Sequence, residues 1–598
     1  MSAYFAPLRD MQFVMHELIG LDEVAQLRGC EEVTPDLVDA ILDEAGKLAS
    51  AVLAPLNKQG DTQGCKLKDH VVTTPDGFKQ AYRQFIDGGW TMLACDPDYG
   101  GQGLPVAVAT PVEEMWHAAN MGFALCQMLT HGAIEAIHLC GTDALKQRFL
   151  AKMVSGEWTG TMNLTEPQAG SDLSAVSTKA VPEGDHYRLF GSKIFITYGE
   201  HDFTENIIHL VLARTPDAPE GVKGISLFVV PKTLVNADGS LGERNDVYCV
   251  SIEHKLGIHA SPTAVLAFGD NGGAVGYLVG EENRGLEYMF IMMNAARFSV
   301  GLQGVAIAER AYQHALTYAK ARIQGAEAGV RGGGKVSIIR HPDVRRMLMS
   351  MKAQVEAMRA LAYFTAASLD KATRHPDAAE RARHQAFADL MIPVVKGWST
   401  ETSIDIASTG IQIQGGMGYV EETGAAQHLR DARITTIYEG TTGIQANDLI
   451  GRKIAREKGA TAQGVIAMMK TTDGQLAEAP GTDFSAIRAA LSEGVRALDE
   501  ATGWIVATYS SDVKAASAGA VPFLELFGIV AGGWQMARAA LAAQAKLSAG
   551  DDSNGSFYKA KISTARFYAD HVLSQAPGLR HAVVGGAAGV LALDEGQF

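Results

Sequence analysis

Apolar residues along this chain recur first at helical spacing, then in alternation, and then at helical spacing again. The first region runs to residue 157, where apolar residues lie three or four positions apart. Thr34 and Thr74 stand where the N-caps of two such helices would be, and Pro75 suits a first helical turn. The helices predicted in this region cover 35–53, 75–87, 110–127 and 143–154.

From Trp158 the period changes to alternation in short runs, which are separated by Gly, Pro, Asp and Asn turns such as PEGD and NADG. Short strands at this density predict a small antiparallel barrel or a pair of sheets. The predicted strands cover 158–164, 174–180, 187–197, 206–214, 224–231, 247–254, 263–269 and 276–279.

Helical spacing returns at Glu287 and continues for most of the remaining chain. Residues 458–482 are rich in Gly, Thr and Ala and contain a Pro-Gly pair, so they are expected to form a linker with one short helix. The long helices predicted on either side of this linker cover 286–323, 342–372, 378–412 and 442–457, and then 483–508, 516–548 and 556–577.

These patterns predict an α+β chain that is mainly α. The expected domains are a helical N-terminal domain (1–157), a central antiparallel β-barrel-like domain (158–282), a helical bundle domain (283–457), and a linker with an extra C-terminal helical domain (458–598).

Composition fits a soluble globular protein. Hydrophobic residues make up 47% of the 598 residues and charged residues 20%. The net charge of −15 argues against nonspecific binding to nucleic acid. The six cysteines form no CxxC pair and are expected to be reduced thiols in a cytoplasmic protein.

No signal peptide or integral membrane segment is expected. The first residues include Arg9 and Asp10 but no basic segment followed by an apolar run. The apolar stretch 518–534 contains Glu525 and several glycines, and is shorter than a bilayer-spanning helix requires.

The segment RITTIYEGTTGIQ, residues 433–445, carries the strongest candidate for chemistry. Its β-branched run from Ile434 to Ile437 favours extended backbone, Gly440 allows a sharp turn, and Thr441 or Thr442 would cap the next helix. Glu439 then lies on a turn fixed from both sides, where a carboxylate could act as a general base. Taken alone, such a residue is more often a solvated turn glutamate.

Three other segments could contact a ligand. NLTEPQAGSD (163–172) combines hydroxyls and backbone amides that could hold a polar cofactor edge, although an ordinary strand-to-turn segment looks the same. KIFIT (193–197) would place a ring and a hydroxyl on one strand face, and is otherwise a half-buried strand. IQIQGGMGY (411–419) has glycines that permit close backbone approach or simply cap a helix.

The order and spacing of these four segments, with Arg322 between the second and third, resemble the acyl-CoA dehydrogenase family across residues 35–455. The start PLRDMQFVMHEL and the C-terminal extension are similar to the long bacterial branch of that family, and within it to enzymes acting on 3-methylmercaptopropionyl-CoA in DMSP degradation. The resemblance implies bound FAD and α,β-dehydrogenation of a short- or medium-chain acyl-CoA. It also places the enzyme in fatty acid metabolism. The implied partners are electron-transfer flavoprotein and a second copy of the chain in a homodimer.

The resemblance also implies roles for particular residues. Glu439 would be the catalytic base, and Gly440, Ser171, Asn294 and Arg297 would contact the substrate. The ARIQG segment lacks the Phe that the family usually places after Arg322, which leaves an aromatic contact there in doubt. The residues matching the family's FAD contacts are Met162, Leu164, Thr165, Ser171, Phe195, Thr197, Arg322, Gln412, Gly415, Gly416 and Thr441.

Two alternatives share the same scaffold. An acyl-CoA oxidase would pass its electrons to oxygen, and no residue distinguishes it from a dehydrogenase. A DNA-associated alkylation-response flavoprotein would need a basic C-terminal face. The C-terminal region instead carries interspersed acids such as Glu478, Asp499 and Glu525, which disfavours that alternative.

Overall fold

The computed structural model describes residues 3–550 and 552–598. The chain forms two compact units, each with its own internal packing. The first comprises Met1–Gly46, Pro105–Ala118 and Val300–Phe598, and the second comprises Lys47–Leu104 and Ala119–Ser299. Each unit therefore joins segments that are far apart in the sequence.

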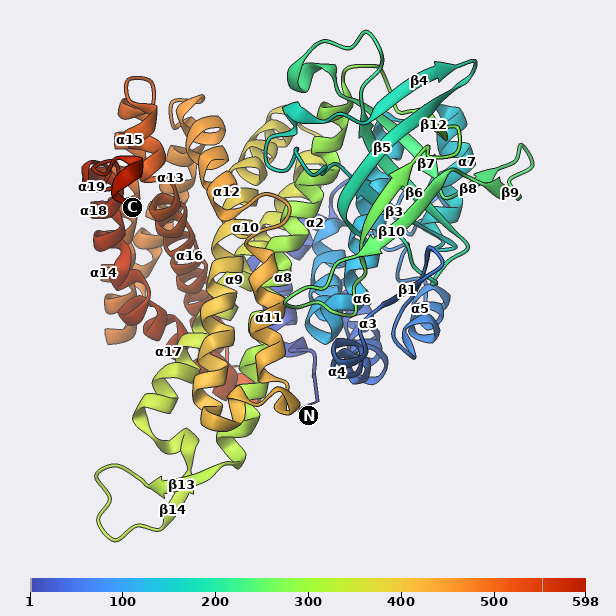
Figure 1. The fold of residues 1–598 in the computed structure, drawn as a ribbon. Helices are drawn as coiled ribbons and strands as arrows, with labels where there is room; N and C mark the ends of the chain where they lie inside the picture. Colours follow the sequence, from blue (N-terminus) through green and yellow to red (C-terminus); the bar gives the residue numbers. More distant parts are fainter. Residues whose placement is uncertain (1–2, 551) are drawn as a thin grey trace. The chain divides into compact units, whose positions relative to one another are not determined.

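The second unit is built on an eight-stranded sheet, drawn in teal and green in Figure 1. Its strands are β3 (Trp158–Asn163), β4 (Lys179–Glu183), β5 (His186–Thr197), β6 (Asn206–Ala213), β7 (Ser226–Pro231), β10 (Val247–Ile252), β11 (Thr263–Phe268) and β12 (Ala274–Leu278). The order is β10-β11-β5-β12-β7-β6-β3, with β4 paired to β5. All these pairings are antiparallel except β3 with β6, which is parallel, so the predicted antiparallel sheet is confirmed apart from one edge.

The predicted strand over 174–180 begins later than expected. The carboxylate of Asp172 accepts a hydrogen bond from the backbone N–H of Ser174 and starts a 3₁₀ turn over Leu173–Ala175, so the strand begins only at Lys179. Two short hairpins were not predicted, because each strand has only three or four residues. They are β1 (Lys66–Lys68) with β2 (Val71–Thr73), and β8 (Thr233–Val235) with β9 (Leu241–Arg244).

The helices confined to the second unit are α4 (Ala54–Gln63), α5 (Phe78–Asp87) and α7 (Asp143–Val154). The expected cap at Thr74 is wrong. Its backbone N–H and its hydroxyl both donate to the Asp202 carboxylate, at 3.2 and 2.7 Å, so α5 begins at Phe78 after Gly77. Thr142, in contrast, caps α7 by accepting from the backbone N–H of Leu145.

The first unit is helical, and two of its predicted helix starts are confirmed. Its helices before the C-terminal region are α1 (Leu8–Phe13), α2 (Leu21–Ala25), α3 (Pro35–Leu48), α9 (Pro342–Arg374), α10 (Ala378–Gln414), α11 (Ala425–Thr435) and α12 (Thr442–Asp448). The hydroxyl of Thr34 accepts from the backbone N–H of Leu37 and caps α3, and Pro342 occupies the first turn of α9. In Figure 1, α9 and α10 run side by side.

The C-terminal region contains no long linker within the described residues. Residues 460–478, expected to be mostly irregular, form a 19-residue helix. Ala462, Val465, Ile466 and Met469 give it a buried stripe at helical spacing, which outweighs its Gly and Thr content. The helices of this region are α13 (Ala460–Glu478), α14 (Thr482–Thr508), α15 (Val513–Ala518), α16 (Ala520–Ser548), α17 (Gly555–His571), α18 (Ala576–Gly585) and α19 (Ala587–Val590).

Among the described residues, two helices are long and apolar enough to cross a membrane. They are α8 (Gly285–Ala321) and α16, and 72% and 83% of their most apolar windows are buried in the protein. The expectation that the apolar stretch near residue 525 is too short to span a bilayer is therefore wrong on length, because α16 has 29 residues. Their burial is typical of core helices. The helices α6 (Val106–Cys140) and α8 each contribute residues to both units.

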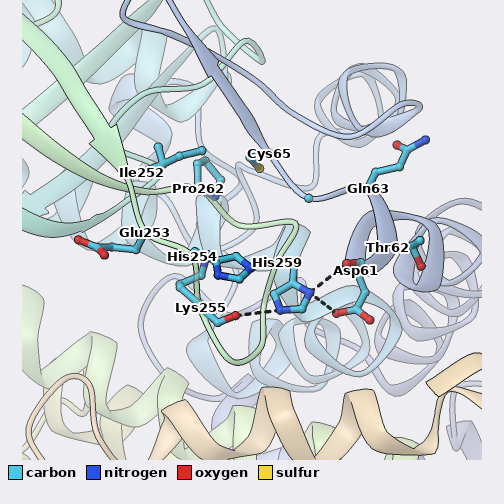
Figure 2. A pocket seen from close by; sticks show the side chains of 11 residues that line it. Asp61, Thr62, Gln63, Cys65, Ile252, Glu253, His254, Lys255, His259 and Pro262 are labelled. Carbon is cyan, nitrogen blue, oxygen red and sulfur yellow. Dashed lines mark hydrogen bonds and ion pairs between the residues drawn. The ribbon is translucent and has the colours of Figure 1, made fainter. Parts of the chain in front are cut away.

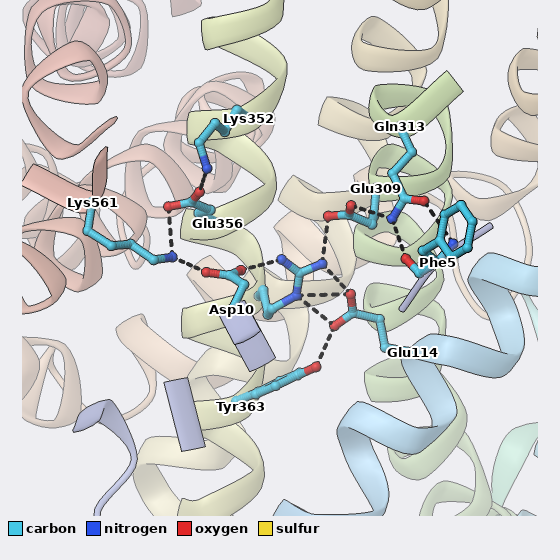
Figure 3. Close-up of polar contacts among 10 residues, drawn as sticks. Phe5, Asp10, Glu114, Glu309, Gln313, Lys352, Glu356, Tyr363 and Lys561 are labelled. Carbon is cyan, nitrogen blue, oxygen red and sulfur yellow. Dashed lines mark hydrogen bonds and ion pairs between the residues drawn. The ribbon is translucent and has the colours of Figure 1, made fainter. Parts of the chain in front are cut away.

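A buried group of charges, the Arg359 cluster, links helices of the first unit (Figure 3). Its members are Asp10, Glu114, Glu309, Glu356, Arg359, Tyr363 and Lys561. The guanidinium of Arg359 is 1% exposed and donates to Glu114 at 2.6 Å, to Glu309 at 2.8 Å and to Asp10 at 2.5 Å. Burial disfavours its charge, but Glu114 and Glu309 outweigh this and raise the pKa of Arg359.

The cluster continues toward the C-terminal helices. Lys561, on α17, donates to Glu356 of α9 at 3.0 Å and also to Asp10 of α1. Lys352, one turn before Glu356, pairs with the same carboxylate. The cluster therefore joins the beginning, the middle and the end of the chain.

Candidate active site

Glu439 lies on a tight turn, Tyr438–Thr441, which we call the Glu439 turn. Glu439 has a φ of +54° and Gly440 a φ of +89°. Positive φ at two successive residues bends the chain sharply. The left-handed region costs a non-glycine residue roughly 1–2 kcal/mol. A glutamate held there is a strained residue of the kind that concentrates at functional sites.

The backbone leading into this turn differs from the predicted extended run. Ile434 and Thr435 are the last residues of α11, and the chain then turns at Thr436. The hydroxyl of Thr435 donates to the carbonyl of Ala432, and that of Thr436 to Arg433. These bonds to the preceding helical turn let two β-branched residues end a helix, so the prediction of extended backbone is wrong.

Both carbonyl groups in the middle of the turn accept hydrogen bonds from buried side chains. The Nε2 of Gln445 donates to the Glu439 carbonyl at 3.1 Å and to the Gly440 carbonyl at 3.3 Å. The Nζ of Lys396, on α10, donates to the Gly440 carbonyl at 2.7 Å. Lys396 and Gln445 are both fully buried. The two peptide planes of the turn are therefore fixed by side chains as well as by sequence.

Residues on either side of the turn are fixed too. The hydroxyl of Tyr438 donates to the side-chain oxygen of Gln303, and burial, with the nearby Glu439 charge, raises the pKa of Tyr438 well above its ordinary value. This phenol therefore stays neutral. Thr441 caps α12 by accepting from the backbone N–H of Ile444 at 3.3 Å, which confirms the predicted cap. Glu439 itself is half-buried.

In the second unit, the segment after β3 is tied to β5 near Phe195. The backbone N–H of Ile194 donates to the Thr165 carbonyl at 2.9 Å, and the Nζ of Lys193 donates to the Leu164 carbonyl at 3.1 Å. Leu164, Thr165 and Phe195, all predicted cofactor contacts, are thus held in one neighbourhood.

A β-bulge sets the direction of the Phe195 ring. On β11, Leu266 pairs with Lys193 and Ala264 with Ile196, so two residues of β5 lie opposite Val265 alone. Phe195 lies in this bulge with a φ of +60°, and 58% of its surface is exposed. Bulges of this kind redirect a side chain away from regular alternation. The expected regular face shared by Phe195 and Thr197 is therefore interrupted, and the aromatic ring is available to a ligand.

Glu166 and Lys193 form the buried ion pair that holds this region together. They lie 2.7 Å apart, and the side chains are 2% and 0% exposed. Glu166 also accepts from the backbone N–H and hydroxyl groups of Ser177 and Thr178, at 2.6 to 3.1 Å. Burial opposes ionisation of this carboxyl, but Lys193 and these donors outweigh it and lower the pKa of Glu166 to about 2.

The other predicted contacts in the second unit differ in exposure. Met162 lies in β3, all of whose residues are buried, and is 7% exposed. Ser171 is exposed on the loop that follows, and Thr197, at the end of β5, is partly buried. Asn294 and Arg297 lie on α8. Arg297 is only 4% exposed, with its guanidinium carbon 6.0 Å from the centre of the Phe290 ring.

The remaining predicted cofactor contacts lie in the first unit. Arg322 is exposed just after α8, at the base of a hairpin formed by β13 (Ile323–Ala326) and β14 (Lys335–Ser337). The segment RGGGK (331–335) lies between these two strands, and its Lys335 begins β14. Gln412 is exposed near the end of α10. Gly415 follows with a φ of +60°, and a Cβ at Gly415 or Gly416 would meet no atom within 4 Å. This glycine segment therefore both ends a helix and leaves open space beside its backbone.

The structure thus groups the predicted residues into two sets. Leu164, Thr165 and Phe195 are tied together in the second unit, while Glu439, Gly440 and Thr441 form one turn in the first.

Sequence reasoning missed the supporting side chains Lys193, Glu166, Lys396, Gln445 and Gln303. Glu166 and Lys193 lie inside segments that were singled out, and a charged residue within an otherwise buried strand was the signal available for Lys193. Lys396 interrupts the apolar run IPVVKGW, which offered the same signal.

A cavity of about 220 Å³ in the second unit contains none of the predicted site residues (Figure 2). It lies where the end of α4 meets the loop after β10. His259 spans it, with Nδ1 3.0 Å from the Asp61 carboxylate and Nε2 2.9 Å from the Lys255 carbonyl. Its cysteine, Cys65, donates to the Ala260 carbonyl, and burial raises the pKa of this thiol to about 12. The His259–Asp61 pair in this cavity joins the loop after β10 to the end of α4.

Models of four protein domains match consecutive parts of the chain. The matches are to the acyl-CoA dehydrogenase N-terminal domain (36–157), the acyl-CoA dehydrogenase middle domain (161–270), the acyl-CoA dehydrogenase C-terminal domain (283–454) and a domain described as acetyl-CoA dehydrogenase C-terminal like (462–594).

Full-length relatives give the same result. A 3-methylmercaptopropionyl-CoA dehydrogenase from Ruegeria pomeroyi is 51% identical over 571 residues, covering 95% of this chain and 96% of that protein. A broad-specificity linear acyl-CoA dehydrogenase from Mycobacterium tuberculosis is 35% identical, with 100% of both chains covered. A solved acyl-CoA dehydrogenase from Bacillus anthracis, complexed with FAD, has the same fold with a TM-score of 0.73 at 20% identity, covering 98% of this chain and 92% of that one.

Proposed function

We propose that this chain, which belongs to the acyl-CoA dehydrogenase family, converts an acyl-CoA thioester to the trans-2-enoyl-CoA with FAD as cofactor and Glu439 as catalytic base. The observation that carries this proposal is the strained, fully supported conformation of Glu439. A carboxylate on a mobile surface turn would need neither left-handed backbone nor two buried donors on its neighbouring carbonyls.

The exposed groups of the chain fit FAD in chemistry. The bulge presents an aromatic ring at Phe195, which suits stacking on a flat heterocycle. The exposed guanidinium of Arg322 suits a diphosphate, and the open backbone at Gly415 and Gly416 permits close approach of a ligand. We assign the remaining flavin contacts to Met162, Leu164, Thr165, Ser171, Thr197, Gln412 and Thr441.

In this mechanism Glu439 removes the α proton of the thioester. The α C–H is weakly acidic, and a hydrogen bond from the backbone N–H of Glu439 to the thioester carbonyl would stabilise the developing enolate charge. Bound FAD supplies the acceptor for the β hydrogen and its electron pair. Gly440, Ser171, Asn294 and Arg297 are assigned to the substrate, and the rigid turn would keep the carboxylate within reach of the α carbon.

We assign the substrate range from a relative and the partners from the family resemblance. A short- or medium-chain acyl-CoA, including 3-methylmercaptopropionyl-CoA, is supported by the Ruegeria pomeroyi enzyme. Electron-transfer flavoprotein is proposed as the electron acceptor, and a homodimer as the assembly. The proposed domain division is the one with four domains given under the sequence analysis. A panel from propionyl-CoA to palmitoyl-CoA with 3-methylmercaptopropionyl-CoA, assayed with electron-transfer flavoprotein and with oxygen as acceptors, tests these assignments. Highest kcat/KM on palmitoyl-CoA would contradict the chain-length assignment, and faster turnover with oxygen would favour an oxidase.

The decisive test of the mechanism is Glu439→Gln. This change keeps the side-chain volume but removes the base, so anaerobic flavin reduction at saturating acyl-CoA should slow by roughly 10²–10⁴-fold. FAD content and acyl-CoA binding should remain. Glu478→Gln, at an exposed glutamate at the end of α13, is the matched control and should reduce its flavin at the original rate. Reduction of the Glu439→Gln flavin at that same rate would place the base elsewhere.

A further inference from the structure

We propose that Lys396 and Gln445 are positioning residues that set the rate of proton removal by holding the Glu439 turn in its left-handed conformation. This inference rests on the proposed role of Glu439 as the base. It adds two residues that contact neither the reacting atoms nor the cofactor in that proposal, yet act on the base through its backbone.

The two donors bind successive carbonyl groups of the Glu439 turn. Gln445 bonds the carbonyl that leaves Glu439, and Lys396 bonds the next carbonyl, that of Gly440. Rotation of either peptide plane changes the backbone angles of Gly440 and, through the first plane, the ψ of Glu439. The pair therefore fixes the angles that aim the glutamate side chain.

Glu439 has a strained backbone. Left-handed backbone is unfavourable for a residue with a Cβ, so the turn would relax unless other contacts hold it. Each buried hydrogen bond to a carbonyl offsets strain of comparable size, and more when the donor is charged. Three such bonds from Lys396 and Gln445 are therefore of the size needed to hold this conformation.

Lys396 is a charged residue in an apolar setting. It is 0% exposed in the middle of α10, between apolar neighbours such as Val395 and Trp398. Burying an ammonium group is costly, and an apolar side chain of similar volume would pack there at lower cost. The 2.7 Å bond to the Gly440 carbonyl is a contact that such an apolar side chain would not make.

Gln445 also packs closely against the turn. A Cβ built on Gly440 would lie 2.7 Å from the Gln445 Nε2. The amide thus fills the space beside Gly440, and a glycine is needed there both for its φ of +89° and for this contact. The Gln445 side chain therefore fits the turn in shape as well as in hydrogen bonding.

The test compares the variants Lys396→Met and Gln445→Leu, each loaded with FAD. Each change gives an apolar side chain of similar volume and removes the hydrogen-bond donor. A displacement of about 1 Å in a reacting group can cost about 10²-fold in rate. We therefore expect flavin reduction at saturating acyl-CoA, and kcat, to fall by roughly 10- to 100-fold, while the Kd for acyl-CoA changes by less than about threefold.

A control separates positioning from general loss of stability. Lys561→Met removes a lysine that is equally buried but bonds to carboxylates of the Arg359 cluster. It should lower stability and leave flavin reduction unchanged. The double variant Lys396→Met/Gln445→Leu should be less impaired than the product of the two single effects, because both changes release the same turn.

Several outcomes would overturn the inference. Original rates in both single variants, alongside an inactive Glu439→Gln, would refute positioning while leaving the proposed base intact. Effects confined to KM would also refute it, as would equal losses in Lys561→Met. If Lys396→Met does not fold, Gln445→Leu decides alone. Flavin reduction at the unmodified protein's rate in Gln445→Leu would then refute the positioning role. Original activity in Glu439→Gln would instead remove the premise.

Discussion

The Arg359 cluster and the Glu439 turn both place a buried cation in the first unit, but they use it differently. Arg359 bonds to carboxylates from three separate helices, so its positive charge is paired with negative ones. Lys396 bonds to a backbone carbonyl of a strained turn. The first arrangement holds elements together, whereas the second holds a conformation. A change in the cluster should therefore cost stability, and a change in the turn should cost rate.

The largest expected effect is on stability, from Arg359→Met. This change leaves the carboxylates of Glu114, Glu309 and Asp10 buried without their cation, which should lower the free energy of unfolding by about 3–5 kcal/mol. The midpoint of urea unfolding of the FAD-loaded protein measures it. Arg383→Met removes an exposed partner of Glu380 and should stay within about 0.5 kcal/mol. Similar losses in both would erase the distinction between buried and exposed pairs.

Glu166→Gln tests whether the buried Glu166–Lys193 pair, beside the proposed flavin contacts, contributes to stability as the Arg359 cluster does. Removing the carboxylate leaves Lys193 buried without its partner, at a cost of about 3 kcal/mol. Because the folded pKa of Glu166, about 2, lies below its ordinary value of 4.5, this stability is present above pH 4.5 and is lost as pH falls toward 2.

The variant should lack this acid dependence in urea midpoints measured between pH 5 and pH 3. Glu183→Gln, at an exposed pair with Arg188, is its control. An unchanged pH slope would show that the ion pair contributes little to stability.

Gly440→Ala should affect rate more than stability. The added Cβ meets Gln445 at 2.7 Å, and alanine disfavours the φ of +89°, so the expected cost is about 1–2 kcal/mol. Displacement of the Gln445 side-chain amide should slow flavin reduction by roughly 10-fold or more. Gly464→Ala on α13 has open space around it and should be neutral or slightly stabilising. Full activity in Gly440→Ala would show that the turn tolerates rearrangement.

Tyr363→Phe should cost stability comparable to that lost in Gly440→Ala but leave the rate of flavin reduction unchanged, so its overall effect is the smallest. This change removes one donor, at 2.7 Å, from Glu114, which keeps its bonds to Arg359, so the loss should be about 1.5 kcal/mol. Combined with Arg359→Met, its effect should differ from the sum of the single effects, since both side chains bind one carboxylate. Strict additivity in urea midpoints would mean that the cluster does not act as a unit.

Much of the fold was predictable because its signals are local. Thr34 and Thr441 cap their helices as expected, and Pro342 begins α9, since each acts within one helical turn. The β-branched run from Ile434 was misread because hydroxyls of Thr435 and Thr436 bond back to the helix. Thr74 was misread because its partner, Asp202, is 128 residues away.

The candidate site divides in the same way. Glu439 and Gly440 could be identified from a short motif, but the donors that fix them could not. Lys396 lies 44 residues from the carbonyl it bonds, and Gln303 lies 135 residues from Tyr438. The bulge that exposes Phe195 depends on register with a second strand, which one strand's own alternation does not contain.

The contact between Asp10 and Lys561 has a consequence for biosynthesis. These residues are separated by 551 positions, so the ribosome makes one partner near the start and the other near the end. At typical translation speeds the interval is roughly half a minute to two minutes. Throughout that time the carboxylate of Asp10 lacks its lysine, and the carboxylate of Glu356 lacks it for the shorter interval in which the next 205 residues are made. A nascent chain released before α17 would thus emerge with its first helix lacking a partner that only a complete polypeptide supplies.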